Sequence, residues 1–392
     1  MYIKKMKSIA FYVHNHESTV TKRFSGVLKE FEKTGRTYLY RLDDLEKEVD
    51  DDVVLAVWEN TSTKAIVGAR RVDIYNHLSA ASTILGDKAN LAILTKLMKR
   101  KTLKSHVFSS GVEFMRWCRR SEDVSEEKKK DDAEFVAKIP QANSGSGIWI
   151  LSQRNRMMLA PEIVRASNSN KIVIQEYVRN PLLRNSRKMQ FRVYFIVKGD
   201  LSCWICRHGL LQVCNKPFQL QVNKDSGDEV HVTNVCRNKH DSKLFQEEKP
   251  CDLPKTFPKV FKSMCEVLVD MIRSASPFLS VQRSSKHFEY VGVDFLADAD
   301  TRQAYLIECN CPPNNTGSIS AEPFHHRVWV DMMKSVVLME DDDRPSSTSW
   351  WMRIDDEEEG KEEKSKVMYS DDGAKLSSNM LRWLLHRRKK SS

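Results

Sequence analysis

Short apolar runs and helical repeats alternate along the first third of the chain. Ser8–Val13, Thr37–Leu42 and Asp52–Glu59 are β-rich apolar runs, each long enough for one strand. Between the first two, Thr21–Lys33 repeats its apolar residues at helical spacing. This alternation predicts a small N-terminal α/β domain, which we place at residues 1–85.

Residues 86–340 are richer in strand patterns and form the second predicted unit. It opens on Lys88–Leu103, where leucines recur on one side and lysines elsewhere, as in an amphipathic helix. Strands are predicted at Phe135–Lys138, Gly147–Leu151, Ile172–Val178, Met189–Lys198, Leu201–His208, Phe288–Ala297 and Ala304–Asn310. Helices are predicted at Phe257–Ser274 and Pro323–Glu340. The fold class is therefore α/β, of the α+β kind in which strands and helices occupy separate stretches.

The composition changes at the end of the chain. Residues 341–378 are acidic and polar, with Pro345 and several serines, which predicts a disordered segment. The final stretch, residues 379–392, contains Asn379–Lys390, which predicts a short basic amphipathic helix. Two interpretations of this helix stay open: it docks its leucines on the neighbouring domain, or it contacts an acidic protein surface or anionic lipid.

Composition excludes several classes of protein. The 392 residues are 41% hydrophobic and 9% aromatic, too apolar for a disordered chain, and no apolar run is as long as a membrane span. The first residues lack the apolar stretch of a signal peptide, so the nine cysteines are expected to be reduced thiols in the cytoplasm. Basic residues number 63 and acidic residues 53, and the net charge of +10 indicates an anionic partner without identifying it.

Polar positions interrupt two neighbouring apolar strands near residue 300. Asp294 lies in the second half of Phe288–Ala297, and Glu308 and Asn310 share one face of Ala304–Asn310. Side-chain oxygens gathered at one place suit Mg²⁺ that carries nucleotide phosphates. The alternative is a surface strand pair with solvated acids, although Glu308 stands among apolar residues.

A lysine followed by a flexible loop is a second candidate. Lys138 ends an apolar strand, and the Gly/Ser-rich loop after it leads into Gly147–Leu151. Such a hairpin can act as a flap whose amides cover phosphates, and a plain hairpin with a polar turn is the alternative. Arg192 lies inside a very apolar strand, where its charge is costly unless it meets an anion. Cys203 and Cys206 lack a second cysteine pair and are predicted to be structural thiols.

Taken in order along the chain, these segments resemble the tubulin tyrosine ligase and tubulin tyrosine ligase-like family of ATP-grasp enzymes. The resemblance covers residues 85–320 and rests on Lys138 with its flap, followed by IVIQEYVRNPLL, KMQFRVYFIV, HVTN, GVDFL and IECNCPPN. It implies an ATP-grasp fold, with ATP between two sheets, behind a small N-terminal α/β domain.

The resemblance also implies a role for each matching residue. The nucleotide would contact Lys88, Lys138, Gln175, Tyr177, Val178, Lys188, His231, Thr233 and Asn234. Arg192 and Arg207 would be catalytic, near the γ-phosphate and the acceptor carboxylate. Asp294, Glu308 and Asn310 would hold Mg²⁺, in agreement with the interpretation of the strands themselves.

The implied reaction joins a free amino acid, tyrosine or glutamate, to a carboxylate of a protein. It consumes ATP and passes through an acyl-phosphate, a chemistry that needs positioning and charge neutralisation more than a protein nucleophile. Tubulin, through its acidic C-terminal tail, is the implied acceptor. The enzyme would lie in the cytoplasm in association with the cytoskeleton, and no nucleic-acid partner is expected.

Two positions depart from the pattern of the family. Glu176 stands where the family usually has lysine, and Gln190 where it usually has aspartate. The first exchanges a donor for an acceptor, and the second removes a negative charge beside the nucleotide. The alternative function is therefore a weak or inactive ATP-grasp pseudoenzyme that binds tubulin or another acidic protein.

Overall fold

A computed structural model defines the fold. It describes residues 8–13, 37–41, 53–57, 74–76, 78, 80–120, 131–140, 142, 146–168, 171–222, 230–233, 249–279, 287–311, 313, 322–337 and 347–355. The predicted helices Thr21–Lys33 and Asn379–Lys390 lie outside the described residues, as does Asn234.

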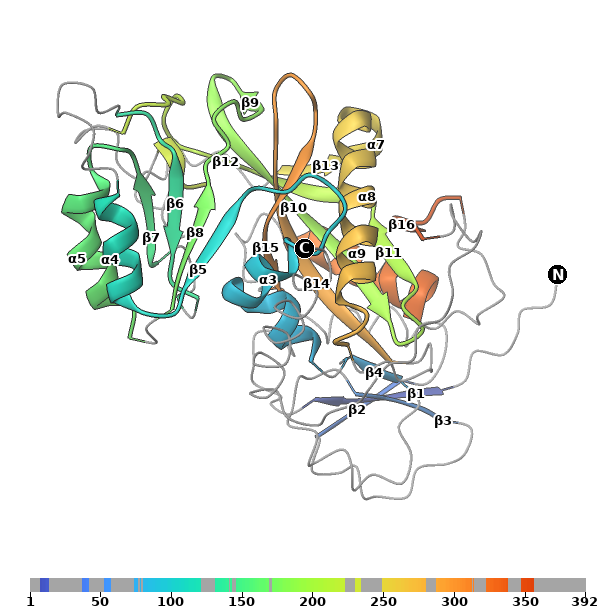
Figure 1. Ribbon diagram of the computed structural model, residues 1–392. Coiled ribbons are helices and arrows are strands. Elements are labelled where there is room, and N and C mark those ends of the chain that lie inside the picture. Colours follow the sequence, from blue (N-terminus) through green and yellow to red (C-terminus); the bar gives the residue numbers. More distant parts are fainter. Residues whose placement is uncertain are drawn as a thin grey trace.

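One large sheet of 12 strands runs through the molecule (Figure 1). Its strands are β1 Ser8–Val13, β2 Thr37–Arg41, β3 Val53–Val57, β4 Ile74–Asn76, β9 Leu183–Arg184, β10 Arg187–Lys198, β11 Cys203–Cys206, β12 His208–Val213, β13 Lys249–Asp252, β14 His287–Ala297, β15 Ala304–Asn310 and β16 Trp351–Arg353. The main order is β13-β12-β10-β14-β4-β3-β1-β2, while β9 and β11 pair with β10, β15 with β14 and β16 with β11.

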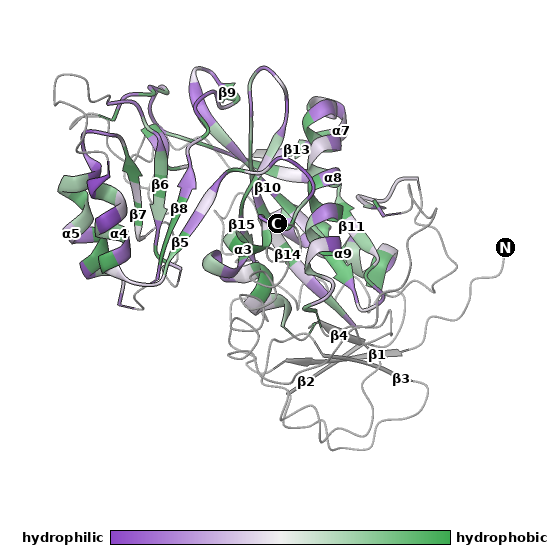
Figure 2. Ribbon diagram, viewed as in Figure 1, coloured by the Kyte–Doolittle hydropathy of each residue, from purple (hydrophilic) through white to green (hydrophobic). Residues whose placement is uncertain are grey.

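Two long antiparallel strands form the centre of this sheet. β10 and β14 pair from Phe191 opposite Phe295 to Lys198 opposite Phe288. Successive residues point to opposite faces, so Phe191 belongs to the core on one face and Tyr194 to the core on the other. Because both faces are covered, the two strands are almost continuously buried, although both green and purple stretches appear along them in Figure 2.

Different helices cover the two faces. The core that contains Phe191 also contains Met264, Leu268 and Met271 of α8 (Pro258–Ala275). The other core contains residues of α9 (Glu322–Met332) and of the π-helical turn η5 (Met333–Val337). This second face, shared by α9 and the even-numbered residues of β10, is also the face that carries the candidate site.

A smaller antiparallel sheet lies beside the large one (Figure 1). Its order is β5-β8-β6-β7, with β5 Ser105–Phe108, β6 Phe135–Lys138, β7 Ile148–Leu151 and β8 Ile172–Glu176. The helices α4 (Gly111–Arg119) and α5 (Arg156–Ala166) pack on one face through Phe114 and Ile163. The side chains of Lys138 and Gln175 lie on the opposite face, which is the one that lines the pocket.

The N-terminal strands are parallel, as expected for an α/β unit. β1 pairs with β2 on one side and with β3 on the other. β4 joins this group to the rest of the sheet, because it pairs with β3 and, through Tyr75 opposite His287, with β14. The predicted strands of residues 1–85 are confirmed, and they continue the large sheet rather than forming a separate one.

The predicted helix at Lys88–Leu103 is shorter than expected. α3 covers Lys88–Leu94, preceded by the π-helical turn η2 (Ser82–Gly86). After Leu94 the backbone tightens into a turn, in which Leu97 N donates to Leu94 O. Arg100 N then donates to the Asp270 carboxylate of α8 at 2.8 Å, a tertiary bond that holds the chain away from the helical path.

The structure also differs from the prediction at Leu201–His208 and in the C-terminal segment. The predicted strand divides into β11 and β12 at Arg207. Residues 347–355, assigned by the sequence to disorder over 341–378, form a turn and β16, which pairs with β11. Trp351 is 1% exposed and its Nε1 donates to Val328 O at 3.1 Å, so one buried aromatic anchors a segment whose average composition is polar.

Several elements lack a strong sequence signal, namely β5, β9, β13, α4, α5 and the short helix α7 (Leu253–Thr256). The predicted helix Phe257–Ser274 is confirmed as α8, and the predicted helix from Pro323 begins as α9. Among the described residues, none of the helices combines the length and the apolar character needed to cross a bilayer.

Candidate functional site

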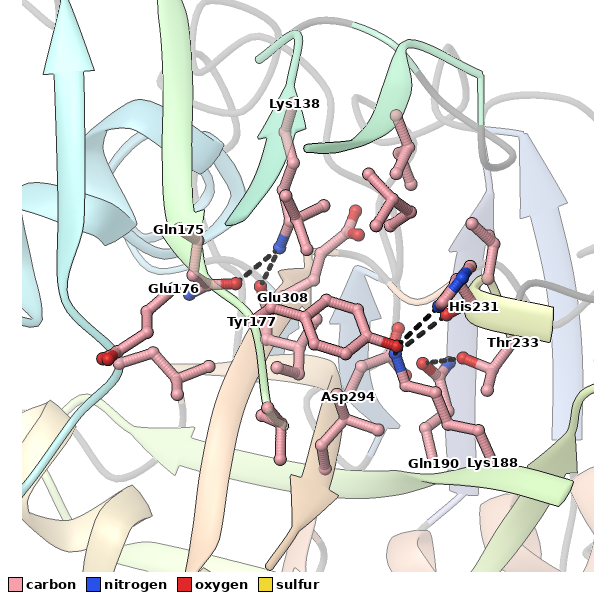
Figure 3. Close-up of a pocket in the computed structure, with 18 residues that line it drawn as sticks. Lys138, Gln175, Glu176, Tyr177, Lys188, Gln190, His231, Thr233, Asp294 and Glu308 are labelled. Carbon is pink, nitrogen blue, oxygen red and sulfur yellow. Dashed lines mark hydrogen bonds between the residues drawn. The ribbon is translucent and has the colours of Figure 1, made fainter. Parts of the chain in front are cut away.

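A pocket lies between the small sheet and the large sheet (Figure 3). The small sheet contributes residues of β6, β7 and β8, and the large sheet contributes residues of β10, β14 and β15. Of the predicted site residues, those that line it are Lys138, Gln175, Tyr177, Val178, Lys188, His231, Thr233, Asp294 and Glu308. Segments from four separate parts of the chain therefore meet where the resemblance placed the nucleotide.

Two buried lysines face the pocket from opposite sheets. Lys138 Nζ donates to Gln175 Oε1 at 2.8 Å and to Ile307 O at 3.2 Å. Lys188 Nζ donates to His231 O at 2.8 Å and lies 4.3 Å from the centre of the Tyr177 ring. Burial lowers the pKa of each lysine to about 8, since the charged form loses its hydration. Phosphate oxygens would compensate for this lost hydration, because they accept hydrogen bonds from the charged amines.

Lys88 connects the flap to the carboxylates. It is held at the start of α3, where the Asp87 carboxylate accepts from Ala89 N and caps the helix. Its Nζ donates to Ala142 O of the flap at 2.8 Å and lies 3.2 Å from Glu308 Oε1. Lys88 thus lies beside Glu308 but not in the lining of the pocket, and its predicted contact with the nucleotide stays a prediction.

Arg192 and Asp294 form the central ion pair of the site. They face one another across β10 and β14, and the guanidinium donates to both carboxylate oxygens, from Nη2 at 2.8 Å. Burial raises the pKa of Asp294, and the neighbouring Glu308 adds to this effect while Arg192 opposes it. Burial disfavours the charge of Arg192 as well, but the adjoining Asp294 carboxylate raises the guanidinium pKa overall.

The three proposed metal ligands lie on adjacent strands. Asp294 is directly opposite Glu308, and Asn310 lies two residues further along β15, opposite Gly292. Asn310 Nδ2 is buried without a hydrogen-bond partner among the described residues, so it can donate to an oxygen of a ligand, whereas a metal ion would bind the amide oxygen. Two carboxylates and an amide are hard donors, and this set fits Mg²⁺.

Among the described residues, no group of three or more His, Cys, Asp or Glu side chains is placed to hold a metal ion. A metal at this place would therefore depend on Asn310 and on oxygens brought by a ligand, as Mg²⁺ bound to nucleotide phosphates does.

Tyr177 and His231 also line the pocket and contact one another there (Figure 3). Tyr177 Oη lies 2.9 Å from His231 Nδ1 and accepts from Lys188 Nζ at 3.2 Å. Burial, together with the smaller effect of the Lys188 charge, lowers the pKa of His231 to about 4, so the imidazole is neutral at pH 7. Its Nε2 is buried without a partner among the described residues and can bind a ligand hydroxyl or phosphate.

The two residues that depart from the family pattern both line the pocket. The side chain of Gln190 accepts from Thr233 Oγ1 and donates to Gln212 Oε1, so both ends of its amide have a protein partner. The carboxylate of Glu176 accepts from Lys104 N at 3.3 Å, while its own backbone N–H donates to Lys104 O. Gln190 is thus a structural part of the wall rather than an open acceptor.

The apolar lining of the pocket was not predicted. It consists of Leu103, Val136, Ile148, Ile150, Val232, Leu296 and Ile307. Some of these positions could have been inferred from strand alternation, since Val136 lies two residues before Lys138 and so on the same face. Apolar side chains on both sheets suit a flat aromatic base.

Arg207 is not part of the pocket lining. It lies between β11 and β12, next to His208, and its predicted catalytic role stays a prediction. Cys203 and Cys206 are buried, free thiols on β11, as predicted. Burial raises the pKa of both thiols, so neither is a reactive thiolate.

A pocket between a small antiparallel sheet and the antiparallel part of the large sheet, with two buried lysines and two neighbouring carboxylates, defines an ATP-grasp-like protein. The comparison with protein families agrees, since the model of the tubulin-tyrosine ligase family matches residues 68–345. The chain belongs to this family.

Individual relatives are more distant. The chain is 31% identical over 163 residues to "Probable tubulin polyglutamylase TTLL9" of Rattus norvegicus, covering 37% of this chain and 34% of that protein. It is 25% identical over 223 residues to "Probable alpha-tubulin polyglutamylase Ttll1" of Tetrahymena thermophila, covering 51% and 53%. With "Probable tubulin--tyrosine ligase PBY1" of Saccharomyces cerevisiae it shares 28% over 167 residues, or 38% and 22%. Each match therefore spans only about a fifth to a half of the relative's own length.

Proposed function

We propose that this protein is an ATP- and Mg²⁺-dependent ligase that joins a free amino acid, tyrosine or glutamate, to a carboxylate of a protein acceptor. Tubulin is the proposed acceptor, because relatives named as polyglutamylases and as a tyrosine ligase all carry tubulin in their names. The protein would act where microtubules are, in the cytoplasm.

The observation that carries this proposal is the arrangement of charge around the pocket. Lys138 and Lys188 enter from opposite sheets, and Arg192 lies beside the Asp294–Glu308 pair. Buried cations on two sides and carboxylates on the floor match a polyanion that carries a divalent cation. A pocket for a neutral metabolite would not need this many buried charges.

The proposed reaction has two steps. An acceptor carboxylate oxygen attacks the γ-phosphorus of ATP, the bond to ADP breaks, and an acyl-phosphate forms. The amino group of the free amino acid then attacks the acyl carbon, and phosphate leaves with the electron pair of the broken C–O bond, while the amine loses a proton. The product is an amide bond, with ADP and phosphate released.

The residues of the pocket contribute positioning and charge. Lys138 and Lys188 would hold phosphate oxygens, and Arg192 would neutralise charge near the γ-phosphate. The neutral His231 would donate or accept a hydrogen bond at the nucleotide through Nε2. Asp294, Glu308 and Asn310 would hold Mg²⁺, which when bound neutralises phosphate charge.

Mass spectrometry of tubulin tests the proposal directly. The protein is incubated with tubulin, Mg-ATP and a mixture of amino acids, and we expect a mass increment of one or more tyrosine or glutamate residues. Fragmentation separates addition at the C-terminus from addition on a side chain. A matched reaction with Lys138→Met should give no increment, and absence of any increment with the parent protein would overturn the proposed activity.

The departures at Glu176 and Gln190 favour a second candidate, an inactive relative that binds an acidic protein. Nucleotide binding separates the two. Mg-ATP should raise the melting temperature of an active ligase, and the combined change Asp294→Ala and Glu308→Ala should abolish this shift. If the parent protein shows no shift but still binds tubulin, the binding function is the correct one.

A further inference from the structure

Three buried side chains of the pocket lining are connected to one another (Figure 3). Tyr177 directly follows β8, and its backbone N–H donates to Glu134 O at 2.8 Å. Its hydroxyl has two neighbours: Lys188 Nζ donates to it at 3.2 Å, and His231 Nδ1 lies 2.9 Å away. Tyr177 and His231 are each 3% exposed and Lys188 is 4% exposed, so bulk water does not supply their hydrogen-bond partners.

The backbone around His231 is fixed independently of its ring. Lys188 Nζ donates to His231 O at 2.8 Å, and two residues further on Thr233 Oγ1 donates to Gln190 Oε1. Lys188 and Gln190 lie on the same face of β10, so this strand holds the segment at two points. In the described part of the chain, the hydrogen bond of the imidazole ring itself is the one with Tyr177.

The protonation states of the three groups leave one arrangement of protons. Burial raises the pKa of Tyr177 well above its usual value and lowers that of His231 to about 4, so at pH 7 the phenol keeps its proton and the imidazole carries one. Lys188, with a pKa of about 8, is mostly charged at pH 7, and an ammonium group only donates. Among the described residues, the Tyr177 O–H therefore has His231 Nδ1 as its acceptor.

An acceptor at Nδ1 places the single proton of the neutral imidazole on Nε2. His231 Nε2 is buried and has no hydrogen-bond partner among the residues that the structure describes. The backbone of Gln221 raises the pKa of His231 slightly, as a nearby carbonyl would, but it does not form a hydrogen bond with Nε2. A buried donor without a partner is costly, and an acceptor atom of a bound ligand would satisfy it.

The nearby thiol of Cys214 does not change this arrangement. A thiolate there would raise the pKa of Tyr177 and of Lys188, but burial raises the pKa of the Cys214 thiol to about 12, so it is neutral at pH 7. The Tyr177 ring also covers the Lys188 ammonium, which lies 4.3 Å from the ring centre. Phenylalanine at position 177 would keep this ring contact and remove only the hydroxyl.

We propose that the hydroxyl of Tyr177 positions His231 as a hydrogen-bond donor, with Nε2–H directed at an acceptor atom of the bound nucleotide. For the identity of the ligand this rests on the proposed function, whereas the position of the proton is a property of the free protein. Tyr177 is a positioning residue in this role, because its hydroxyl acts through His231. The site would favour a ligand that presents a lone pair at this point over one that presents an N–H or O–H group.

Nuclear magnetic resonance of the free protein tests the position of the proton. The full-length protein is prepared with histidine labelled with nitrogen-15 in the ring, and the His231 signals are identified by their loss in His231→Gln. At pH 7 we expect a protonated Nε2 and an unprotonated Nδ1. In Tyr177→Phe, which keeps the ring over Lys188, the Nδ1 signal should move towards that of a nitrogen that accepts no hydrogen bond.

Calorimetric titration with Mg-ATP tests the donor. Tyr177→Phe should weaken binding about threefold and His231→Leu about tenfold, since the loss of one buried hydrogen bond is of this size. His231→Gln should stay within about twofold of the parent, because its amide nitrogen can donate from near the place of Nε2. Tyr194→Phe is the matched control, because it removes a buried hydroxyl that lies 3.3 Å from His325 Nδ1, outside the lining of the pocket. It should change neither the His231 signals nor the ATP affinity.

The outcomes are distinct. A protonated Nδ1 in the parent protein overturns the proposal, and so does an Nδ1 signal that is the same in Tyr177→Phe. If Mg-ATP binds the parent and His231→Leu equally well, Nε2–H does not meet the nucleotide, and the proposal is wrong. If the expected proton position is found but the parent does not bind Mg-ATP, positioning by Tyr177 is supported and the proposed ligase fails. If tubulin is modified while Nδ1 carries the proton, the ligase stands and the positioning role fails.

Discussion

Arg192 and Asp294 occupy facing positions on β10 and β14, and the guanidinium donates hydrogen bonds to both oxygens of the carboxylate. On its other side, β14 places Asp294 opposite Glu308 of β15. The chain therefore supplies a cation of its own to one of the carboxylates proposed to hold Mg²⁺. The same pair fixes the arginine that would lie nearest to the reacting phosphate.

Removing Asp294 should cost stability as well as function. Asp294→Ala leaves the charge of Arg192 largely buried without its partner, and breaking such a pair costs about 3–5 kcal/mol. Urea denaturation measures this loss. The combined change Arg192→Met and Asp294→Leu should recover most of the stability, yet show no thermal shift with Mg-ATP. If the double variant is as unstable as Asp294→Ala, the ion pair is not the cause.

Lys188 should make stability and nucleotide affinity respond to pH in opposite directions. Burial lowers its pKa to about 8, below the unfolded value of about 10.4. Between these values the unfolded chain binds a proton that the folded chain lacks, so the contribution of Lys188 to the free energy of unfolding rises with pH. ATP affinity should fall over the same range, because a neutral amine does not pair with phosphate.

Parallel titrations of the parent and Lys188→Met check this prediction. Urea midpoints and ATP dissociation constants are measured from pH 7 to pH 10, and the stability deficit of the parent relative to the variant should shrink as pH rises. Lys259→Met, at an exposed position of α8, is the control and should show no such trend. An ATP affinity of the parent that does not change across this range contradicts the placement of Lys188 at the phosphates.

The carboxylate of Glu176 should weaken the binding of a polyanion. It lines the pocket, and its hydrogen bond to Lys104 N is long, at 3.3 Å. Glu176→Lys restores the residue type usual in the family, and we expect the ATP dissociation constant to fall about fivefold, with Glu176→Gln giving about half of this gain in free energy. Calorimetric titration with Mg-ATP measures both variants. Equal affinity in all three proteins would show that this side chain does not face bound nucleotide.

Gly292 is expected to tolerate no side chain. A Cβ built there would lie 2.7 Å from Pro313 Cβ and 3.5 Å from Arg192 Cδ. Gly292→Ala should cost about 1–3 kcal/mol by overpacking against Pro313, and the shift that relieves this contact should lower ligase activity, because Gly292 lies opposite Asn310. Gly86→Ala is the matched control, because its Cβ would meet Cys311 Cβ at an ordinary 3.6 Å. A Gly292→Ala variant as stable and active as Gly86→Ala would contradict this prediction.

The long central elements could be predicted from the sequence because their patterns are uniform. β10 and β14 are buried almost throughout and α8 keeps one apolar face, each over at least eleven residues, and their ends match the predictions closely. β13 and β16 are only 4 and 3 residues long, and they form because a neighbouring strand offers an open edge. A pairing partner far away in the sequence leaves no local signal.

The candidate site likewise contains residues with a local sequence signal and residues whose role depends on distant parts of the chain. Asp294 and Glu308 are conspicuous because each interrupts an apolar strand, and Lys138 because it ends one before a Gly/Ser-rich loop. The apolar residues that line the pocket cannot be distinguished in the sequence from apolar residues of the hydrophobic core. The contacts of Lys88 with the flap could not be predicted either, because they depend on how the two sheets are placed against one another.

The short strand β4 has a consequence for shortened versions of the protein. β15 covers one edge of β14 from Gly292 to Ala297, and β4 covers the remaining end of that edge at His287 and Phe288. A fragment that begins after Asn76 would therefore leave this end of a central strand open to pairing with another chain. Such a fragment would keep only the region that matches the family most clearly, and we expect it to self-associate. In the full chain, β4 pairs with this end of β14 and so blocks it.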